Sequence, residues 1–575
     1  MKSSTVMRLS LACVALTALA GLSLGQGDDY GPAKVSYDDY IKRPSLQMRT
    51  RGRVKLAQTG DKRALKILSD NYAKPEDPKD QVKYLLTSIS AQYLNGEELL
   101  PMWKEWRGKY TKPEDAWLWY RGLIVQQGYQ GDEELMATAK DTKKGLFLRA
   151  AALEAMAEQS SDQILPLMLE MLPEVGELKA GIDRIVMLET FAHLYYARAH
   201  ELGSDNFRNV GLKFIPMMDV KQTEDRTRLV MARYFREIFS TTQLYINSEP
   251  WLDKLLNPTK PEDPANSKYK PVAPPTKFVG VEASGKRIVY VIDLSDSMMK
   301  PISVKEKEEI KKPPVPKGPT TPGRGEKGSP NGPKEPEKEA EKPKEKDVAD
   351  DLPWKDIKCR FHVAREYLKL SLKSLRPDQE YCVIGFGSEA KFFNSTKGLM
   401  PASAQNIQGT IRELDAIKPG PATDIRKDGT LWGDTNLHGG IHRAFKAKRG
   451  GPVKEYEYVD PSTFTDGADT VFILSDGDPT DDDWAMQDKR DPWDQTGDPE
   501  TRTKMADQDI LRFPGPYGYW QGNGQSNFIV DDVRRLNLFR KCEINCIGIG
   551  EATYNMLQGI ARQALGGQVK MVSSN

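Results

Sequence analysis

Histidine and cysteine are scarce in this sequence. Only 5 histidines and 5 cysteines occur among 575 residues, and no two cysteines have the Cys-x-x-Cys spacing of a zinc knuckle. The sequence also has no Gly-x-Ser-x-Gly nucleophile elbow, no Walker loop and no glycine fingerprint for dinucleotides. It therefore contains none of these common catalytic or nucleotide-binding motifs.

An excess of charge of one sign is absent as well. Lysine and arginine total 83, and aspartate and glutamate total 82. Such a balance produces no broad field toward nucleic acid or anionic lipid, so no nucleic-acid partner is expected. After the first 25 residues there is no apolar run long enough to cross a bilayer. We therefore expect no integral membrane span in the mature chain.

The first 25 residues have the composition of a secretory signal peptide. Lys2 and Arg8 give a positive start, and an apolar stretch of small and large residues follows from Leu9 to Leu24. Ser23 and Gly25 are small enough for a cleavage site, so we expect cleavage after Gly25. This predicts export to the periplasm, the cell surface or the medium. A retained membrane anchor is the alternative.

Four cysteines would remain after cleavage, namely Cys359, Cys382, Cys542 and Cys546. Cys542 and Cys546 fall on one predicted strand, where a separation of four residues spans roughly 13 Å, too far for a disulfide. An exported protein can form disulfides. We nevertheless expect buried free thiols that pack as small apolar groups.

The rest of the chain divides into an extended leader at 26–57, a helical region at 58–256, a linker at 257–284 and a C-terminal domain at 285–575. In the helical region, Leu146, Ala150, Leu153 and Ala157 recur at helical spacing. Amphipathic helix pairs of this kind favour an α-solenoid that loosely resembles HEAT or tetratricopeptide repeats. A non-repeating helical bundle is the alternative, because no strict repeat period is present.

From residue 285 the pattern changes to short apolar runs that alternate with helical segments. Buried strands are predicted at 288–292, 381–386, 470–474 and 544–549, and helices near 360–375, 403–416, 437–448 and 552–565. This alternation favours a doubly wound, Rossmann-like α/β fold with a mostly parallel sheet. Two inserts interrupt the domain. We expect residues 300–353, rich in Lys, Glu and Pro, to be disordered, and residues 480–527 to form a long loop.

Oxygen-bearing side chains follow the first predicted strand, in the segment Asp293-Leu294-Ser295-Asp296-Ser297. Open α/β sheets bind their ligands beyond the carboxyl ends of the strands. One carboxylate and two hydroxyls at alternate positions can turn three oxygens toward one point, and Mg²⁺ prefers oxygen ligands. Thr435 precedes a predicted helix and Asp476 ends a predicted strand. Each can add an oxygen at the same edge of the sheet.

The order of these residues resembles the metal-ion-dependent adhesion site (MIDAS) of von Willebrand factor A (VWA) domains. The resemblance covers about residues 285–573 and includes the last strand and helix around 544–567. It implies one bound Mg²⁺, with Mn²⁺ or Ca²⁺ as alternatives, and an open position for an Asp or Glu of a partner protein. The ligands that it implies are Asp293, Ser295, Ser297, Thr435 and Asp476. Asp296 departs from the family, in which many members have glycine.

We therefore expect an exported, cation-dependent adhesion or scaffold protein that binds an acidic protein ligand, and not an enzyme. A metal-dependent hydrolase is one alternative, with Asp296 and His438 as the candidate bases. A self-assembling envelope protein, in which one copy binds the next, is another. His438 and His442 are four residues apart on a predicted helix but lack the glutamate of a metalloprotease motif. We expect them to pack or to face solvent, although His438 is close enough to Thr435 to influence the site.

Overall fold

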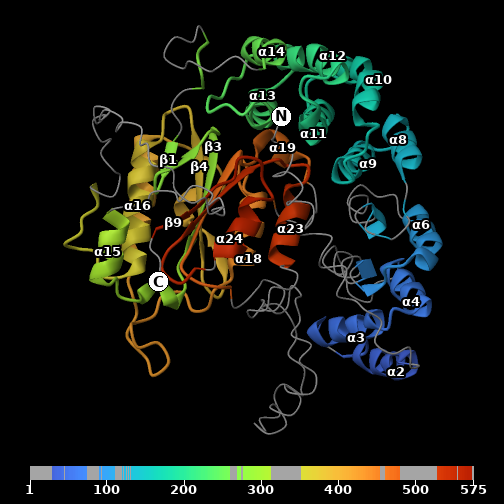
Figure 1. Cartoon of the computed structure of the whole chain (residues 1–575). Helices are drawn as coiled ribbons and strands as arrows, with labels where there is room; N and C mark the ends of the chain where they lie inside the picture. Colours follow the sequence, from blue (N-terminus) through green and yellow to red (C-terminus); the bar gives the residue numbers. More distant parts are fainter. Residues whose placement is uncertain are drawn as a thin grey trace, which may run out of the picture.

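The structure is a computed structural model. It describes residues 29–43, 46–73, 90–109 apart from 92, parts of 120–131, 132–258, 269–272, 276–311, 351–453, 460–479, and 528–572 apart from 553. These residues form a curved array of helices followed by an α/β domain (Figure 1). The predicted combination of an all-α region and an α/β domain is therefore confirmed. The expected signal peptide and the expected loop at 480–527 lie outside the described residues.

Eleven described helices make up the helical array: α2 (Tyr30–Tyr40), α3 (Leu46–Gln58), α4 (Lys62–Ala73), α6 (Leu100–Lys109), α8 (Asp132–Lys140), α9 (Leu146–Glu158), α10 (Ile164–Glu177), α11 (Ile182–Ala197), α12 (Asp205–Phe214), α13 (Asp225–Ile238) and α14 (Glu249–Leu256). From α9 onward they lie in two rows. Helices α9, α11 and α13 contact one another in the first row, and α10, α12 and α14 do so in the second. The first-row helices begin at residues 146, 182 and 225, so their spacing is not constant.

Helix α9 shows why this array folds. Every residue from Phe147 to Ala157 is buried, as expected for a helix that is apolar on most sides. One side contacts α8 and another contacts α11. Phe147 at its start meets Phe464 and Phe539 of the α/β domain, with ring centroids 5.7 and 5.3 Å away. The helix is thus enclosed by its own array and by the neighbouring domain. Within the described part of the chain, no helix is both long and apolar enough to cross a membrane.

The expected extended leader at 26–57 is wrong where the structure describes it, because α2 and α3 lie there. The two helices pack closely at Gly52, where an added Cβ would lie 2.9 Å from the Cβ of Tyr40. Tyr37 is buried in this contact region, as are Val54 and Leu56. The apolar residues are too few to give a helical period, so the stability of this segment comes from tertiary packing.

The α/β domain contains the strands β1 (Thr276–Phe278), β2 (Val281–Ala283), β3 (Arg287–Asp293), β4 (Glu380–Phe386), β5 (Ala390–Phe392), β6 (Met400–Pro401), β7 (Thr470–Ser475), β8 (Glu543–Gly548) and β9 (Val569–Met571). Its described helices are α15 (Val304–Lys311), α16 (Arg360–Ser374), α17 (Ala404–Ala416), α18 (Leu437–Lys446), α19 (Ser462–Asp466), α23 (Phe528–Asn537) and α24 (Tyr554–Ala561). The sheet has the order β5-β4-β3-β7-β8-β9. Strands β4, β3, β7, β8 and β9 are parallel, and β5 and β6 pair antiparallel with β4.

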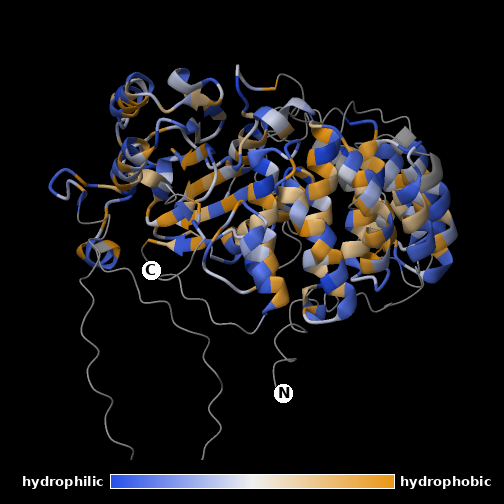
Figure 2. Cartoon of the chain, turned by 90° about the horizontal axis from the view of Figure 1, so that it is seen from above, coloured by the Kyte–Doolittle hydropathy of each residue, from blue (hydrophilic) through white to orange (hydrophobic). Residues whose placement is uncertain are grey.

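Both faces of the sheet are covered, which explains the uninterrupted apolar runs of its strands. In β3, Ile288, Tyr290 and Ile292 enter the core that includes α16 and α17. Val289 and Val291 point the other way, into the core with α18, α23 and α24. Figure 2 shows hydrophobic residues along the strands between these helices. This alternation is the arrangement expected of a sheet buried on two sides.

Two expected boundaries of the domain are wrong. The expected linker at 257–284 contains the β1–β2 hairpin, whose Phe278 packs on the rings of Tyr290 and Phe472 at 5.3 and 5.4 Å. The expected disordered insert contains α15, which begins with a capping box: the amide of Glu306 donates to Ser303 Oγ at 3.1 Å, and the Glu306 carboxylate accepts from the amide of Ser303 at 2.7 Å. Residues 312–350 of that insert lie outside the described residues.

The four cysteines Cys359, Cys382, Cys542 and Cys546 are buried free thiols. Burial raises the pKa of Cys382 to about 12 and also raises the pKa of Cys546. The prediction that they behave as small apolar residues is therefore confirmed.

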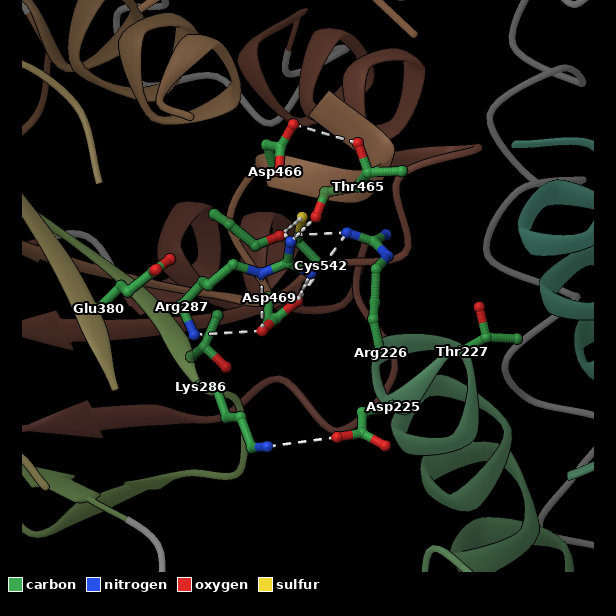
Figure 3. Close-up of polar contacts among 12 residues, drawn as sticks. Asp225, Arg226, Thr227, Lys286, Arg287, Glu380, Thr465, Asp466, Asp469 and Cys542 are labelled. Atoms are coloured by element: carbon green, nitrogen blue, oxygen red, sulfur yellow. Dashed lines mark hydrogen bonds and ion pairs between the residues drawn. The ribbon is translucent and has the colours of Figure 1, made fainter. Parts of the chain in front are cut away.

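The helical array attaches to the amino ends of the central strands. Arg226 of α13 donates to the backbone carbonyls of Ala468 and Arg540. Beside it, Arg287 at the start of β3 forms an ion pair with Asp469, at 2.7 Å (Figure 3). Although burial opposes ionisation, Arg287 and Arg226 hold the pKa of Asp469 below its usual value. Glu189, 3.3 Å from Arg226, supplies a second buried negative charge, in keeping with the rule that buried charges are paired.

Two buried ion pairs also join the domains. Arg233 of α13 contacts Glu543 at the start of β8, at 3.0 Å. Lys541, just before β8, contacts Glu154 of α9 at 2.7 Å. The carboxyl ends of the same strands lie at the opposite edge of the sheet. The array is therefore attached at the end of the sheet opposite these carboxyl ends.

Candidate functional site

Four predicted ligands converge at the carboxyl ends of β3 and β7. Asp293 Oδ1 lies 2.6 Å from Ser295 Oγ, which lies 2.8 Å from Ser297 Oγ. Ser297 Oγ lies in turn 2.6 Å from Asp476 Oδ1. These oxygens form a continuous row from one strand end to the next. Because β3 and β7 are adjacent parallel strands, their last residues bring Asp293 and Asp476 to the same edge.

Two more hydrogen bonds fix the orientation of the Asp293 carboxylate. The amide of Ser295 donates to Asp293 Oδ1 at 2.9 Å, and Ser475 Oγ donates to Asp293 Oδ2 at 2.7 Å. Asp293 is fully buried, and Ser295 and Asp476 are nearly so. Each carboxylate therefore has one fixed orientation, with an oxygen directed at the serine hydroxyls.

Asp296 points away from this row of oxygens. Its Oδ1 accepts hydrogen bonds from the amides of Leu431 and Gly433 at 2.6 and 3.0 Å, and its own amide donates to the carbonyl of Gly433 at 2.7 Å. Arg426 lies 3.4 Å from Asp296 Oδ2. Asp296 thus supplies a tether between the loop after β3 and the loop before α18.

Thr435 lies in the tethered loop, two residues before α18 begins at Leu437. It is buried. The amide of Asn436 donates to the carbonyl of Gly387, beyond the end of β4, at 2.7 Å, and Asn436 Oδ1 accepts from the amide of Gly439 at 2.7 Å. This second contact is a helix N-cap. Thr435 is therefore held at the same edge of the sheet as the other four residues.

Burying the charged forms of Asp293 and Asp476 costs free energy unless a neighbouring charge compensates them. Burial raises the pKa of Asp293 to about 7, with Asp476 as the second cause, and burial also raises the pKa of Asp476. Arg360 at the start of α16 offsets part of this cost, because its Nη1 lies 3.0 Å from Asp476 Oδ2. Asp476 Oδ1 remains directed at Ser297. The pair favours an additional positive charge near its facing oxygens.

The oxygen spacing suits a small, hard cation. An octahedral Mg²⁺ with bonds of about 2.1 Å holds neighbouring ligand atoms roughly 2.9 Å apart. The contacts from Asp293 to Ser295, Ser297 and Asp476 measure 2.6, 2.8 and 2.6 Å. Shifts of a few tenths of an ångström would give that spacing. Neighbouring oxygens of the row are therefore spaced nearly as the ligands of one Mg²⁺ are, which is compatible with the predicted metal.

Arg360 and Ser475 are site residues that the sequence analysis missed. Ser475 immediately precedes Asp476 and is the last residue of β7, so its position at a strand end could have indicated it. Arg360 comes from the amino end of a helix distant in sequence, and no local pattern indicates that it contacts Asp476.

A second cluster lies behind the site, between α18 and α23. Of the two environments expected for His438 and His442, packing or solvent exposure, the structure shows burial, and both rings also contact Asp532. His438 Nε2 lies 2.9 Å and His442 Nε2 lies 2.5 Å from Asp532 Oδ2. Arg535 donates to the other oxygen, Oδ1, at 2.6 Å. The three residues form a group whose ligand atoms all lie within 4.8 Å of one another.

Comparisons with known proteins add little to this description. No family model matches the sequence, and no curated protein matches it. One matching solved structure is a point mutant of the PilB minor pilin from Streptococcus sanguinis. The match has 12% sequence identity and a TM-score of 0.24, and covers 52% of this chain and 59% of that chain. So low a TM-score supports no structural argument.

Proposed function

We propose that the C-terminal domain is a VWA-type domain that binds one divalent cation, Mg²⁺ before Mn²⁺ or Ca²⁺, and through it an acidic residue of a partner protein. The ligands of the cation are Asp293, Ser295, Ser297, Thr435 and Asp476. The observation that carries the proposal is the row of four oxygens at the carboxyl edge of the sheet, which begins and ends with an oxygen of a buried carboxylate. Two carboxylates leave a hydrated cation able to accept a third from outside.

The surface around this edge supports docking of a protein. Val304, Ile425 and Tyr554 are 80%, 85% and 45% exposed. Ile425 precedes Arg426, which contacts the tether residue Asp296. Val304 and Tyr554 follow the loops after β3 and β8. Exposed apolar side chains around a charged site are typical of protein interfaces.

The helical array acts in this proposal as a scaffold. Its buried ion pairs fix it to the amino ends of the strands, which leaves the proposed ligand-binding edge uncovered by the array. An exported adhesion or scaffold protein requires such a division, with one surface for the partner and another for attachment.

The test is calorimetric titration of Mg²⁺ and Mn²⁺ into the full mature chain. We expect one saturable site in the wild type and none in the Asp293→Ala/Asp476→Ala variant. Asp424→Ala is the matched control, because this exposed aspartate lies in a loop at the same edge and should leave binding unchanged. Absence of binding at millimolar metal, with a folded protein, would refute the proposal.

The open coordination position has a separate readout. Mn²⁺ bound with exchangeable water enhances water-proton relaxation, and a carboxylate that replaces this water lowers the enhancement. We expect a glutamate-containing peptide to lower it and the corresponding glutamine peptide not to. If Mg²⁺ instead increases light scattering by the protein alone, the partner is a second copy of this chain.

A further inference from the structure

We propose that His438, His442 and Asp532 form a second cation site, for a divalent transition-metal ion such as Zn²⁺, separate from the oxygen site. The cluster has two imidazole nitrogens and one carboxylate oxygen. This donor set suits Zn²⁺ and its neighbours, whereas Mg²⁺ prefers oxygen alone. The two sites would therefore select different metals.

The geometry brings the three donors to one point. His438 and His442 are one turn apart on α18, so both rings leave the same side of the helix, with centroids 4.2 Å apart. Both Nε2 atoms approach the same oxygen of Asp532, on α23. Two histidines at this spacing on a helix are the arrangement of several zinc sites.

The distances require only a small expansion. A tetrahedral Zn²⁺ with bonds of about 2.0 Å separates its ligand atoms by roughly 3.3 Å. The two Nε2 atoms lie 2.9 and 2.5 Å from Asp532 Oδ2. Outward shifts of less than an ångström would admit the ion. Three protein donors leave a fourth position for water or another ligand.

A neighbouring side chain holds the Asp532 carboxylate in an orientation suited to a metal. Arg535 donates to Asp532 Oδ1 at 2.6 Å and leaves Oδ2 directed at the rings, as outer partners commonly orient a metal-bound carboxylate. All three residues are 3% exposed or less.

A competing explanation is a metal-free hydrogen-bond network in which both imidazoles donate to Asp532. The two explanations differ in metal content. We would load the full chain, free of any histidine tag, with Zn²⁺ or Co²⁺, dialyse it, and measure bound metal by mass spectrometry. For Co²⁺ we would also record the visible absorption, which is intense only for four- or five-coordinate ions.

We expect one equivalent of bound metal in the wild type and in Asp293→Ala, which separates this site from the oxygen site. Removal of a ligand should weaken binding by more than roughly tenfold, in His442→Gln and in Asp532→Asn. His362→Gln, a half-buried histidine on α16, is the matched control and should bind as the wild type does.

Wild-type protein that retains no Zn²⁺ or Co²⁺ would overturn the proposal, and so would undiminished binding in folded His442→Gln. If the ligand variants do not fold, X-ray absorption of the Zn²⁺-loaded wild type decides the question. Imidazole scattering from two histidines supports the site, and its absence excludes it.

Discussion

The ion pair between Lys541 and Glu154 allows the attachment of the two domains to be tested quantitatively. The atoms lie 2.7 Å apart, and the side chains are 9% and 0% exposed. His193 also contacts Glu154, at 2.6 Å. Although burial opposes it, Lys541 and His193 together lower the pKa of Glu154 from 4.5 to about 2. At about 1.4 kcal/mol per unit, this corresponds to roughly 3 kcal/mol of stability at neutral pH.

We therefore predict that Lys541→Met lowers the free energy of unfolding by about 3 kcal/mol at pH 7, because it leaves a buried carboxylate without its main partner. The sign of the pH dependence follows from the lowered pKa. The contribution of Glu154 is complete above pH 4.5 and is lost as pH falls toward 2. The difference between wild type and variant should therefore shrink in that range.

The assay is urea unfolding followed by tryptophan fluorescence at several pH values. Glu154→Gln/Lys541→Met is the first control and should recover much of the loss, because no charge is left buried. Lys286→Met is the second. Lys286 also joins the domains, through Asp225 at 3.2 Å, but both side chains are more than half exposed, so the loss should be at most about 0.5 kcal/mol. A loss independent of pH, or one equal in Lys541→Met and the double variant, would refute the reasoning.

Three further predictions concern the site and the core. Asp296→Ala should weaken Mg²⁺ binding roughly tenfold in calorimetry, because the tether to the loop before α18 is lost, whereas Asp296→Asn keeps an acceptor and should weaken it less. Gly433→Ala should lower the free energy of unfolding by about 1–3 kcal/mol in urea titrations, because Gly433 has φ +85° and an added Cβ would lie 2.4 Å from Ser388 Oγ; a stabilised variant would contradict this. The four buried cysteines should not react with a thiol reagent in the native protein and should all react in denaturant, and early reaction of any one would contradict their burial.

The sheet was predictable because its signals are local. The apolar runs at 288–292, 381–386, 470–474 and 544–549 each fall within an observed strand or one residue beyond it. A strand buried on both faces consists almost entirely of apolar residues, so it stands out in a mixed sequence. The same holds for Asp293, Ser295 and Ser297, which follow one strand directly.

Two of the remaining features depend on contacts between distant residues. Arg360 reaches Asp476 and Asp532 reaches His442 only after the chain has folded, so neither pairing has a sequence period. Helix α15 depends on the Ser303–Glu306 capping box and on the burial of Ile310. Charged residues dominate the expected insert, so its composition indicates neither the capping box nor the buried isoleucine. Composition therefore identified the wrong boundary for the insert.

The position of the helical array also determines how the protein would respond to mechanical load. A pull on a partner held at Asp293 would enter at the carboxyl end of β3 and pass across its hydrogen bonds to β7, before whose amino end Arg226 of the array donates to the carbonyl of Ala468. Force along parallel strands loads all the hydrogen bonds between β3 and its neighbours β4 and β7 at once. Bonds loaded together in shear resist far more force than bonds that open one after another. If the proposed metal site holds a partner, tension on that contact would therefore load the sheet in its strongest direction.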